Sequence, residues 1–504
     1  MKKFDPWRRT MLVVVCLAAA LAALFLVFEG RGSKPKPNQE TKVEVKDVYT
    51  DADFAAYEVL PGVCNMKELM SGLIGFGETG SGKSTGAFRT ALYRSWKHPS
   101  KPATLVLVAK PEVYEETLEL ATLAGRGDQV VDLAKERIDI LDTALKLRGS
   151  VLDASSILKH VIEADAKRSS KGDDGSNRFF YDAADRVCHA ATAILYHATG
   201  SASISGIYEM VTDQKAAEEH IKLGLSKKVD DDDWNAAVTL FRGEWKSMGD
   251  RQKSAVLGVA INSIGKFLRS GFSTTFSSGV TTWTPWDADA KGLISVANWP
   301  LMDGEGGRLG QIALKILVQK YALMRRKADH PRPFVIAADE LQLFALPEND
   351  AYVQAVCRDR RLISLCMTQN IPLLRAAVGG EDARDEVDAL IANHGVKVIA
   401  CNSDPETNRW ASGLCGSHWV DVQGGGVTPG GYSPERDMRG QDQGAGAHLH
   451  WNANYRPCLD PEAFTQLHRG GDGWVQTVVY QTGRVYPSTG RPWTYAWFNQ
   501  NEGA

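Results

Sequence analysis

The strongest constraint on how this 504-residue chain folds is one glycine-rich segment, Gly77-Glu78-Thr79-Gly80-Ser81-Gly82-Lys83-Ser84. A short apolar run, residues 73–76, precedes it, and residues 85–92 after it have the composition of a helix. Strand, glycine loop and helix in this order are the context that a P-loop requires. The sequence therefore predicts a buried strand whose carboxyl end carries a phosphate-binding loop.

This loop predicts both a ligand and a metal. Its glycines let successive backbone N–H groups turn toward phosphate oxygens, and the N-terminus of the following helix points at the same anion. Lys83 can reach the β- and γ-phosphates, and the hydroxyl of Ser84 can bind Mg²⁺. We therefore expect ATP and Mg²⁺ as cofactors. The predicted nucleotide-binding residues are Gly77, Glu78, Thr79, Gly80, Ser81, Gly82, Lys83, Ser84 and Thr85.

Further buried strands recur along the chain. Continuous apolar, β-branched runs are typical of parallel strands that are covered on both faces of a sheet. Such a run lies at residues 103–109, and further strand patterns lie at 129–133, 292–300, 333–338, 362–368 and 396–400. Helical patterns, for example 115–123 and 308–326, separate them. Strands that alternate with helices after a P-loop predict an α/β fold with a doubly wound, RecA-like sheet.

Long helical periodicity with few strand signals characterises residues 151–275. A chain of 504 residues is too long for one compact core, so several folded units are expected. We therefore predict an all-α domain inserted between strands of the nucleotide-binding domain. The predicted division is a tail with a transmembrane helix at 1–30, a linker at 31–50, the first part of the nucleotide-binding domain at 51–150, the all-α domain at 151–275 and its second part at 276–504.

Polar side chains at two later strand ends complete a hydrolytic site. Residues 333–338 form an apolar run that ends in Asp339 and Glu340, the pattern of a Walker B segment. Asp339 can hold Mg²⁺ opposite Ser84, and Glu340 can orient and deprotonate the attacking water. Gln369 ends the next strand, where an amide can sense the γ-phosphate.

Three arginines before that strand are candidates for an arginine finger. Arg358, Arg360 and Arg361 crowd together, and one of them can reach the ATP of a neighbouring subunit. A solvated basic helix face is the alternative for each of them. The residues thus predict Lys83, Asp339, Glu340 and Gln369 as catalytic, together with one of these three arginines, and they predict Ser84 and Asp339 as the Mg²⁺ ligands.

The N-terminus predicts a membrane anchor. Residues 11–28 are an uninterrupted apolar run of 18 residues, about 27 Å long as a helix. A cleaved signal peptide is the alternative, but its apolar region is normally shorter. Lysines and arginines flank the run on both sides, so charge does not decide the orientation. Because ATP is cytosolic, we expect a single-pass protein of the bacterial inner membrane with its ATPase body in the cytoplasm.

Composition excludes some classes of partner and site. The formal net charge of −3 gives no global basic excess, so a contact with DNA needs a local patch or a pore formed by assembly. The eight cysteines lack zinc spacing, and the aspartates at 230–233 are typical of a negative first helical turn. His448 and His450 after the glycine-rich segment 424–446 have no nearby partner for a metal site. Residues 473–498 predict a terminal β-hairpin.

Taken together, the motifs resemble one family, the TraD/TraG-like coupling ATPases of conjugation and type IV secretion, in the FtsK/HerA class. The segments that carry the resemblance are GETGSGKST at 77–85, LVLVAKPE at 105–112, GRGDQVVDL at 125–133, ISVANWPLMDGEGGRLGQIALK at 294–315, RPFVIAADELQLF at 332–344, RDRRLISLCMTQNIP at 358–372 and KVIACNSDPETNRWASGLCG at 397–416. Many members have two membrane helices, whereas this chain has one apolar segment.

The resemblance implies a role and partners. It implies a homo-oligomer, a hexamer, with ATP between neighbouring subunits and Arg358 as the finger. It implies partners among DNA, single-stranded and with bound relaxase, relaxosome or effector proteins, the channel of a type IV secretion system and the membrane. Two alternatives remain: an FtsK/HerA-like translocase of double-stranded DNA, and a non-hydrolysing, membrane-tethered scaffold.

Overall fold

A nine-stranded sheet lies at the centre of the fold. The computed structural model describes residues 49–169, 178–428 and 446–502. The strands of the sheet are β3 (Leu73–Phe76), β4 (Ala103–Leu107), β5 (Val130–Asp132), β6 (Ile294–Ala297), β7 (Phe334–Ala338), β8 (Leu362–Thr368), β9 (Val396–Ile399), β12 (Trp474–Gln481) and β13 (Trp493–Asn499). Their order in space is β13-β12-β9-β3-β8-β7-β4-β6-β5.

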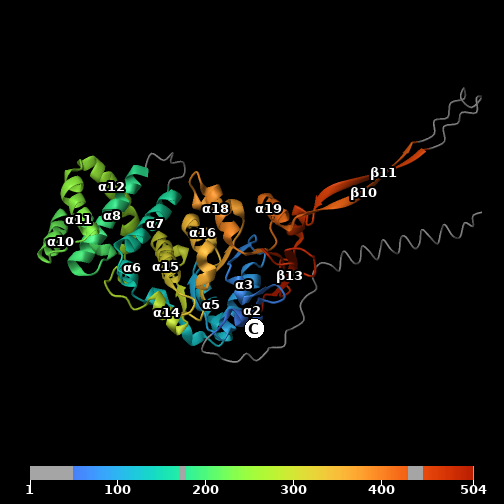
Figure 1. Ribbon diagram of the computed structural model, residues 1–504, viewed down its shortest axis with the longest axis horizontal. Helices are drawn as coiled ribbons and strands as arrows, with labels where there is room; N and C mark the ends of the chain where they lie inside the picture. Colours follow the sequence, from blue (N-terminus) through green and yellow to red (C-terminus); the bar gives the residue numbers. More distant parts are fainter. Residues whose placement is uncertain (1–48, 170–177, 429–445, 503–504) are drawn as a thin grey trace, which may run out of the picture.

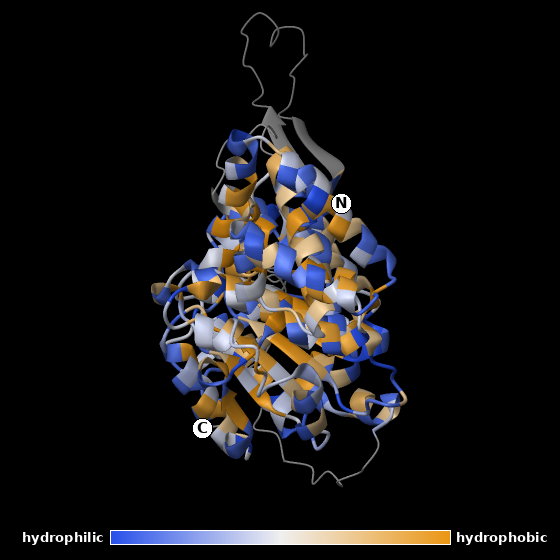
Figure 2. Ribbon diagram, turned by 90° about the vertical axis from the view of Figure 1, so that its left-hand side faces the viewer, coloured by the Kyte–Doolittle hydropathy of each residue, from blue (hydrophilic) through white to orange (hydrophobic). Residues whose placement is uncertain are grey.

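The strands from β9 to β5 are parallel to one another, as the apolar runs predict. All residues of β3, β4 and β7 are buried, which fits strands covered on both faces. Figure 2 shows these hydrophobic strands at the centre of the body, with helices around them that carry hydrophilic residues. The predicted α/β class is therefore confirmed.

One edge of the sheet is antiparallel, which makes the sheet mixed. The predicted C-terminal hairpin is present as β12 and β13, which pair in antiparallel register. In addition, β12 pairs with β9, for example Val478 with Ile399, so the hairpin extends the central sheet. The sequence predicted the hairpin but not its place, because the pairing partner of a strand is not a local property of the chain.

Helices cover both faces of the sheet. One face packs against α2 (Asp51–Ala56), α3 (Met66–Leu69), α4 (Arg89–Lys97) and α5 (Glu112–Leu123) around one hydrophobic cluster. The other face packs against helices that include α15 (Glu305–Met324), α16 (Pro347–Val356), α17 (Ile371–Val378) and α18 (Ala383–Asn393). Further helices of this region are α6 (Ile140–Arg148), α14 (Pro285–Lys291) and α19 (Pro405–Cys415). This layering is the doubly wound arrangement.

A block of helices separates β5 from β6 in the chain. Its helices are α7 (Val151–Ser169), α8 (Arg178–Thr199), α9 (Ile204–Thr212), α10 (Gln214–Ser226), α11 (Asp232–Leu240), α12 (Asp250–Ile264) and α13 (Ser273–Phe276). Figure 1 shows most of this block at one end of the elongated molecule. The aspartate run indeed begins a helix, because the side chain of Asp231 accepts hydrogen bonds from the N–H groups of Asp233 and Trp234.

The helical block and the sheet share one hydrophobic core. The same cluster of buried residues contains Ile74 of the sheet and Leu195 and Trp234 of the block. Between them lies α15, which is buried around almost its whole circumference, as expected of a helix between two layers. The hydrophobic core therefore continues from the helical block into the sheet.

A two-stranded ribbon projects from the opposite end of the molecule (Figure 1). It consists of β10 (Ser417–Thr428) and β11 (Gly446–Pro457), paired antiparallel over their whole described length. The glycine-rich segment predicted as a loop therefore begins and ends in strands, and residues 429–445 lie outside the described residues. The side chains of His448 and His450 lie outside them too.

The predicted membrane localisation needs a correction. In the part of the chain that the structure describes, no helix is both long enough and apolar enough to span a bilayer. The apolar segment 11–28, on which the anchor was predicted, lies outside the described residues. The single-pass inner-membrane assignment, and the transmembrane helix in the predicted fold class, are therefore not supported.

Candidate nucleotide-binding site

The predicted site residues lie at one edge of the sheet. In the strand order, β8 lies between the P-loop strand β3 and the Walker B strand β7. The three strands are parallel and in register, with Phe76 opposite Thr368 and Ala338 opposite Cys366. Their carboxyl ends therefore meet, and this edge is where open α/β sheets bind ligands.

The P-loop is fastened to the strands on both sides. The N–H of Gly77 donates to the carbonyl oxygens of Thr368 (3.2 Å) and Gln369 (3.1 Å), and the N–H of Glu78 donates to the carbonyl oxygen of Cys401 (3.1 Å). The tip of the loop is exposed, whereas Lys83 is buried. Gly82 has a positive φ of 78°, and a Cβ atom there would lie 2.3 Å from Val475 of β12. The hairpin therefore packs directly against the loop.

The helix after the loop differs from the prediction. Residues Ser84–Phe88 form a wide turn in which Gly86 has non-helical angles (φ −91°, ψ −106°), and α4 begins only at Arg89. A Cβ atom at Gly86 would lie 3.3 Å from Val475. The departure from a regular helix thus has a tertiary cause, because the C-terminal hairpin occupies the space beside this turn.

Ser84 and Asp339 meet, as the Walker motifs predict. The hydroxyl of Ser84 lies 2.8 Å from Oδ1 and 2.7 Å from Oδ2 of Asp339. Burial raises the pKa of Asp339, and the hydrogen bond from Ser84 opposes this shift. Burial and the neighbouring Asp339 also raise the pKa of Glu116, a residue of α5. A hydroxyl and a carboxylate are hard oxygen donors of the kind that Mg²⁺ prefers.

A cluster of three or more histidine, cysteine or acidic residues with metal-binding geometry does not occur among the described residues. A P-loop metal site does not need one, because phosphate oxygens and waters supply the other ligands. The residues present therefore fit Mg²⁺ bound together with a nucleotide.

Glu340 lies among cations at the centre of the site. Its Oε1 is 3.8 Å from the ammonium of Lys83 and 3.9 Å from that of Lys110, and its Oε2 accepts a hydrogen bond from the amide of Gln342 (2.5 Å). The side chain of Glu340 is 9% exposed and that of Lys110 is 64% exposed. A buried carboxylate between a P-loop lysine and an exposed lysine can accept a proton from a water molecule.

Lys110 and Gln342 were not predicted as site residues. The sequence did contain a signal for Lys110, because this residue follows the buried strand β4 and therefore lies at the same edge of the sheet. The signal for Gln342 was weaker: this residue lies two positions after Glu340, in a short helical turn, Leu341–Leu343.

The C-terminal residues also contact the P-loop. Arg469 forms an ion pair with Glu78, and its Nε lies 3.2 Å from Sγ of Cys401. The amide of Gln500 donates to the hydroxyl of Thr85 (2.7 Å). The contacts of Arg469 with Glu78 and of Gln500 with Thr85 join residues about 400 positions apart, and no sequence signal indicates them.

Gln369 lies at the end of β8, as predicted. Its carbonyl oxygen accepts hydrogen bonds from the N–H of Gly77 and from the side chain of Asn402 (2.9 Å). The backbone of Gln369 therefore contacts the start of the loop, which agrees with its predicted location. Its role as a γ-phosphate sensor stays a prediction.

The three candidate finger residues lie at the opposite edge of the sheet. They belong to or follow the short turn Cys357–Arg360, which precedes the amino end of β8. Arg358 is exposed, whereas Arg361 is buried. The structure therefore does not bring any of them to the nucleotide site of its own chain.

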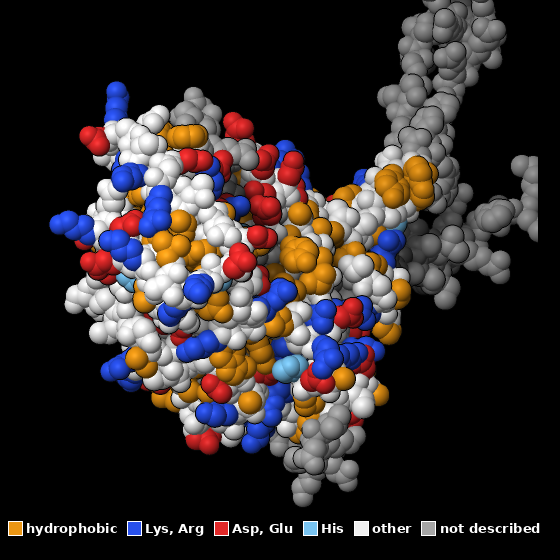
Figure 3. All heavy atoms as spheres, turned by 60° about the vertical axis from the view of Figure 1, so that its left-hand side comes forward, with side chains coloured by type: hydrophobic (Ala, Val, Ile, Leu, Met, Phe, Trp, Pro, Cys, Tyr) orange, Lys and Arg blue, Asp and Glu red, His pale blue; other side chains and the backbone are white. Residues whose placement is uncertain are grey.

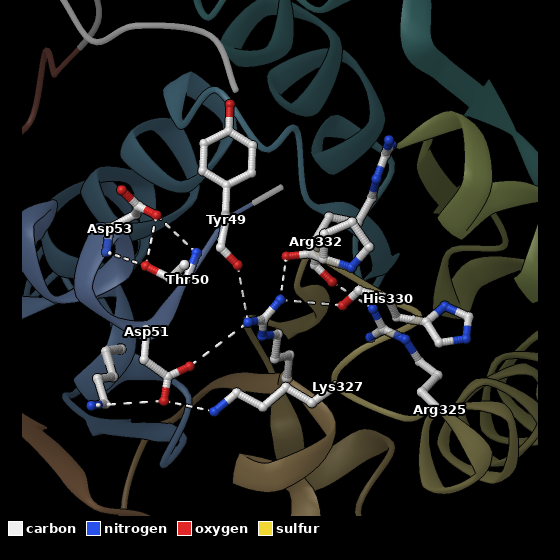
Figure 4. A network of polar contacts seen from close by, with 11 residues as sticks. Tyr49, Thr50, Asp51, Asp53, Arg325, Lys327, His330 and Arg332 are labelled. Carbon is white, nitrogen blue, oxygen red and sulfur yellow. Dashed lines mark hydrogen bonds and ion pairs between the residues drawn. The ribbon is translucent and has the colours of Figure 1, made fainter. Parts of the chain in front are cut away.

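Two of these arginines have structural partners. Arg361 donates to the carbonyl oxygens of Tyr49 (3.1 Å) and Pro331 (2.6 Å) and lies 3.7 Å from Asp51. Figure 4 shows this network, in which dashed lines connect the carbonyl oxygen of Tyr49 and the carboxylate of Asp51 to the same guanidinium group. Arg360 donates to the carbonyl oxygen of Arg325 (2.8 Å). Arg358 alone of the three is exposed, and among the described residues its guanidinium group makes no hydrogen bond or ion pair, although its backbone carbonyl accepts the N–H of Arg361 (3.3 Å).

Comparison with known proteins identifies the fold. No protein-family model and no curated protein sequence matches the chain. Solved structures of the bacterial conjugative coupling protein TrwB do match. Its unbound form is 16% identical, with a TM-score of 0.56 over 87% of this chain and 86% of that one.

Two further TrwB structures contain nucleotide. The complex with a non-hydrolysable ATP analogue is 16% identical, with a TM-score of 0.58 over 88% of this chain and 89% of that one. The complex with ADP and Mg²⁺ is 15% identical, with a TM-score of 0.57 over 87% of each chain. The predicted resemblance to TraD/TraG-like coupling proteins is thereby confirmed at the level of the fold.

Proposed function

We propose that this chain is a coupling ATPase of a conjugation or type IV secretion system. It binds ATP and Mg²⁺ and uses hydrolysis to move DNA with a bound relaxase, or a protein substrate, toward the secretion channel. The observation that carries the proposal is the convergence of Ser84, Asp339 and Glu340 at one sheet edge, with the Ser84 hydroxyl 2.7 Å from Asp339. The fold shared with TrwB supports the transport role.

In the proposed reaction Glu340 accepts a proton from a water molecule. The oxygen of that water bonds to the γ-phosphorus, while the bond from this phosphorus to the β–γ bridging oxygen breaks and ADP leaves with the electron pair. Lys83 holds the β- and γ-phosphates. As the nucleotide binds, Lys83 can exchange its 3.8 Å contact with Glu340 for phosphate oxygens, which leaves Oε1 available to water.

Ser84 and Asp339 would hold the metal. When bound, Mg²⁺ neutralises charge on the phosphate oxygens. The hydrogen bond between the two side chains brings their oxygens together before the metal arrives. Lys110, which is mostly exposed, adds positive charge at the outer side of the site.

A ring of subunits accounts for Arg358 and for the distribution of charge. Because Arg358 is exposed at the edge of the sheet away from its own P-loop, we propose that it acts on the ATP of a neighbouring subunit in a hexamer. On the face shown in Figure 3, acidic and basic side chains are interspersed over the rounded body. A face mixed in this way does not form a single basic surface for DNA, so we propose that a DNA path forms only on assembly, such as the inside of a ring.

The test is ATP turnover by the purified protein with and without single-stranded DNA. We expect hydrolysis that increases with single-stranded DNA and that is abolished by Glu340→Gln, while ATP binding remains. A matched control is Glu119→Gln, which changes an exposed glutamate of α5 in the same way and should leave turnover unchanged.

Other outcomes would identify the two alternatives. Stimulation by double-stranded DNA alone would favour an FtsK/HerA-like translocase. Unchanged plasmid transfer in cells that carry Glu340→Gln or Lys83→Ala would refute the motor and favour a non-hydrolysing scaffold.

A further inference from the structure

We propose that Gln342 is a positioning residue that holds the Glu340 carboxylate in the orientation needed to accept a proton from water. This inference rests on the proposed ATPase function and adds a residue to its mechanism. Glu340 and Gln342 both follow β7, and the two side chains turn toward each other over one short helical turn, Leu341–Leu343.

A chain of hydrogen bonds fixes the carboxylate. Nε2 of Gln342 donates to Oε2 of Glu340 at 2.5 Å, and Oε1 of Gln342 accepts from the hydroxyl of Thr368 at 2.9 Å. Thr368 is fully buried at the end of β8, and its carbonyl oxygen accepts the N–H of Gly77. The amide of Gln342 thus links the Walker B carboxylate to the strand that supports the P-loop.

Chemistry determines which way the amide points. An ionised carboxylate only accepts hydrogen bonds, so the NH₂ group of Gln342 must face Glu340 and its oxygen must face Thr368. The hydroxyl of Thr368 must then donate. Only one arrangement of the three groups makes both hydrogen bonds, and the charge-assisted bond to the carboxylate is about twice as strong as a neutral one.

The two oxygens of Glu340 consequently have different roles. Oε2 is held by Gln342, whereas Oε1 faces Lys83 and Lys110 at distances of 3.8 and 3.9 Å, beyond a hydrogen bond. Because one oxygen is held, rotation of the carboxylate is restricted and the other oxygen stays directed at the site. Holding a catalytic group in place can change a rate by about 100-fold.

Gln342 can be changed without disturbing a close-packed core. It is half-buried and lines a cavity together with His160 and Glu163 of α7 and Pro347 of α16. Gln342→Met keeps the length of the side chain and removes both hydrogen bonds. The protein is therefore expected to fold, and its melting temperature checks this directly.

The experiment measures ATP turnover, ATP affinity and thermal unfolding for Gln342→Met. We expect kcat to fall by about 10–100-fold, with the dissociation constant for ATP and the melting temperature close to those of the unchanged protein. Thr368→Val, which removes the supporting hydroxyl, should lower kcat in the same direction. The double variant should be no slower than Gln342→Met, because both changes break one chain of bonds.

Gln354→Met is the matched control. Gln354 is a glutamine of α16 whose amide donates to the carbonyl oxygen of Ser71, away from Glu340. Its substitution should leave kcat unchanged. An unchanged kcat for Gln342→Met, or a loss that reflects weaker ATP binding, overturns the inference. The proposed function fails separately, if the unchanged protein shows no hydrolysis that depends on Glu340.

Discussion

The sharpest consequence of the structure concerns Arg358. β8 runs for seven residues, about 20 Å, between the turn that carries Arg358 and the edge that carries the P-loop. This span is several times the reach of an arginine side chain. If Arg358 contributes to hydrolysis, it must do so in the site of another subunit.

Arg358→Ala should therefore remove ATP turnover without removing ATP binding. An arginine finger contributes about 10³–10⁵ in rate, or at least about 4 kcal/mol of transition-state stabilisation. Arg360→Ala and Arg361→Ala are the comparisons. Because Arg361 is buried among carbonyl groups and Asp51, Arg361→Ala should lower the melting temperature.

Mixing two inactive variants tests whether Arg358 acts in trans. Arg358→Ala retains its own P-loop, and Lys83→Ala retains its own finger. In a randomly mixed ring about one interface in four combines an intact P-loop with an intact finger, so about a quarter of the normal turnover should return. No recovery on mixing, or normal turnover by Arg358→Ala alone, would refute the reasoning.

Three further predictions concern stability and pH. Gly82→Ala should destabilise the protein by about 2–4 kcal/mol in urea unfolding, because of its positive φ and the clash with Val475, whereas Gly80→Ala, which has open space around it, should cost only about 1 kcal/mol. Asp339→Asn should raise the melting temperature at pH 7 in the absence of nucleotide. The pKa of Asp339 is raised in the folded state, so its ionisation lowers the stability as pH rises above the unfolded pKa of 3.8, and asparagine cannot ionise. An unchanged or lower melting temperature would contradict this. Burial lowers the pKa of His98 to about 4, so the folded protein should lose up to about 3 kcal/mol as pH falls from 6.5 toward 4, and His98→Asn should flatten this part of a stability–pH curve.

The local sequence pattern was sufficient to predict the strands and the residues that form the site. Apolar runs identified most of the parallel strands, because a strand buried on both faces is largely apolar. The half-buried edge strand β5, which contains Asp132, is an exception. Polar residues at the ends of two later strands, Asp339 and Gln369, were then predicted to form one site with Ser84. Their positions in the structure agree with this, and Ser84 and Asp339 are in hydrogen-bond contact.

Two other sequence patterns, the arginine cluster and the N-terminal apolar segment, were less informative about the structure. The three arginines Arg358, Arg360 and Arg361 look alike in the sequence. Only the packed structure shows that two of them satisfy buried carbonyl oxygens while Arg358 remains exposed. The apolar segment 11–28 had the length of a membrane helix, but the described residues contain no helix that could span a bilayer.

The sequence by itself determined the α/β class, the order of the strands along the chain and the residues of the two Walker motifs. These follow from composition and spacing, which are properties of neighbouring residues. Only the tertiary structure decided that the C-terminal hairpin joins the sheet beside β9 and packs on Gly82, that Gln342 and Thr368 hold Glu340, and that Arg358 lies away from its own site. The physical reason is that such contacts depend on which strand lies beside which, and the pairing of distant strands is settled by the packing of the whole core.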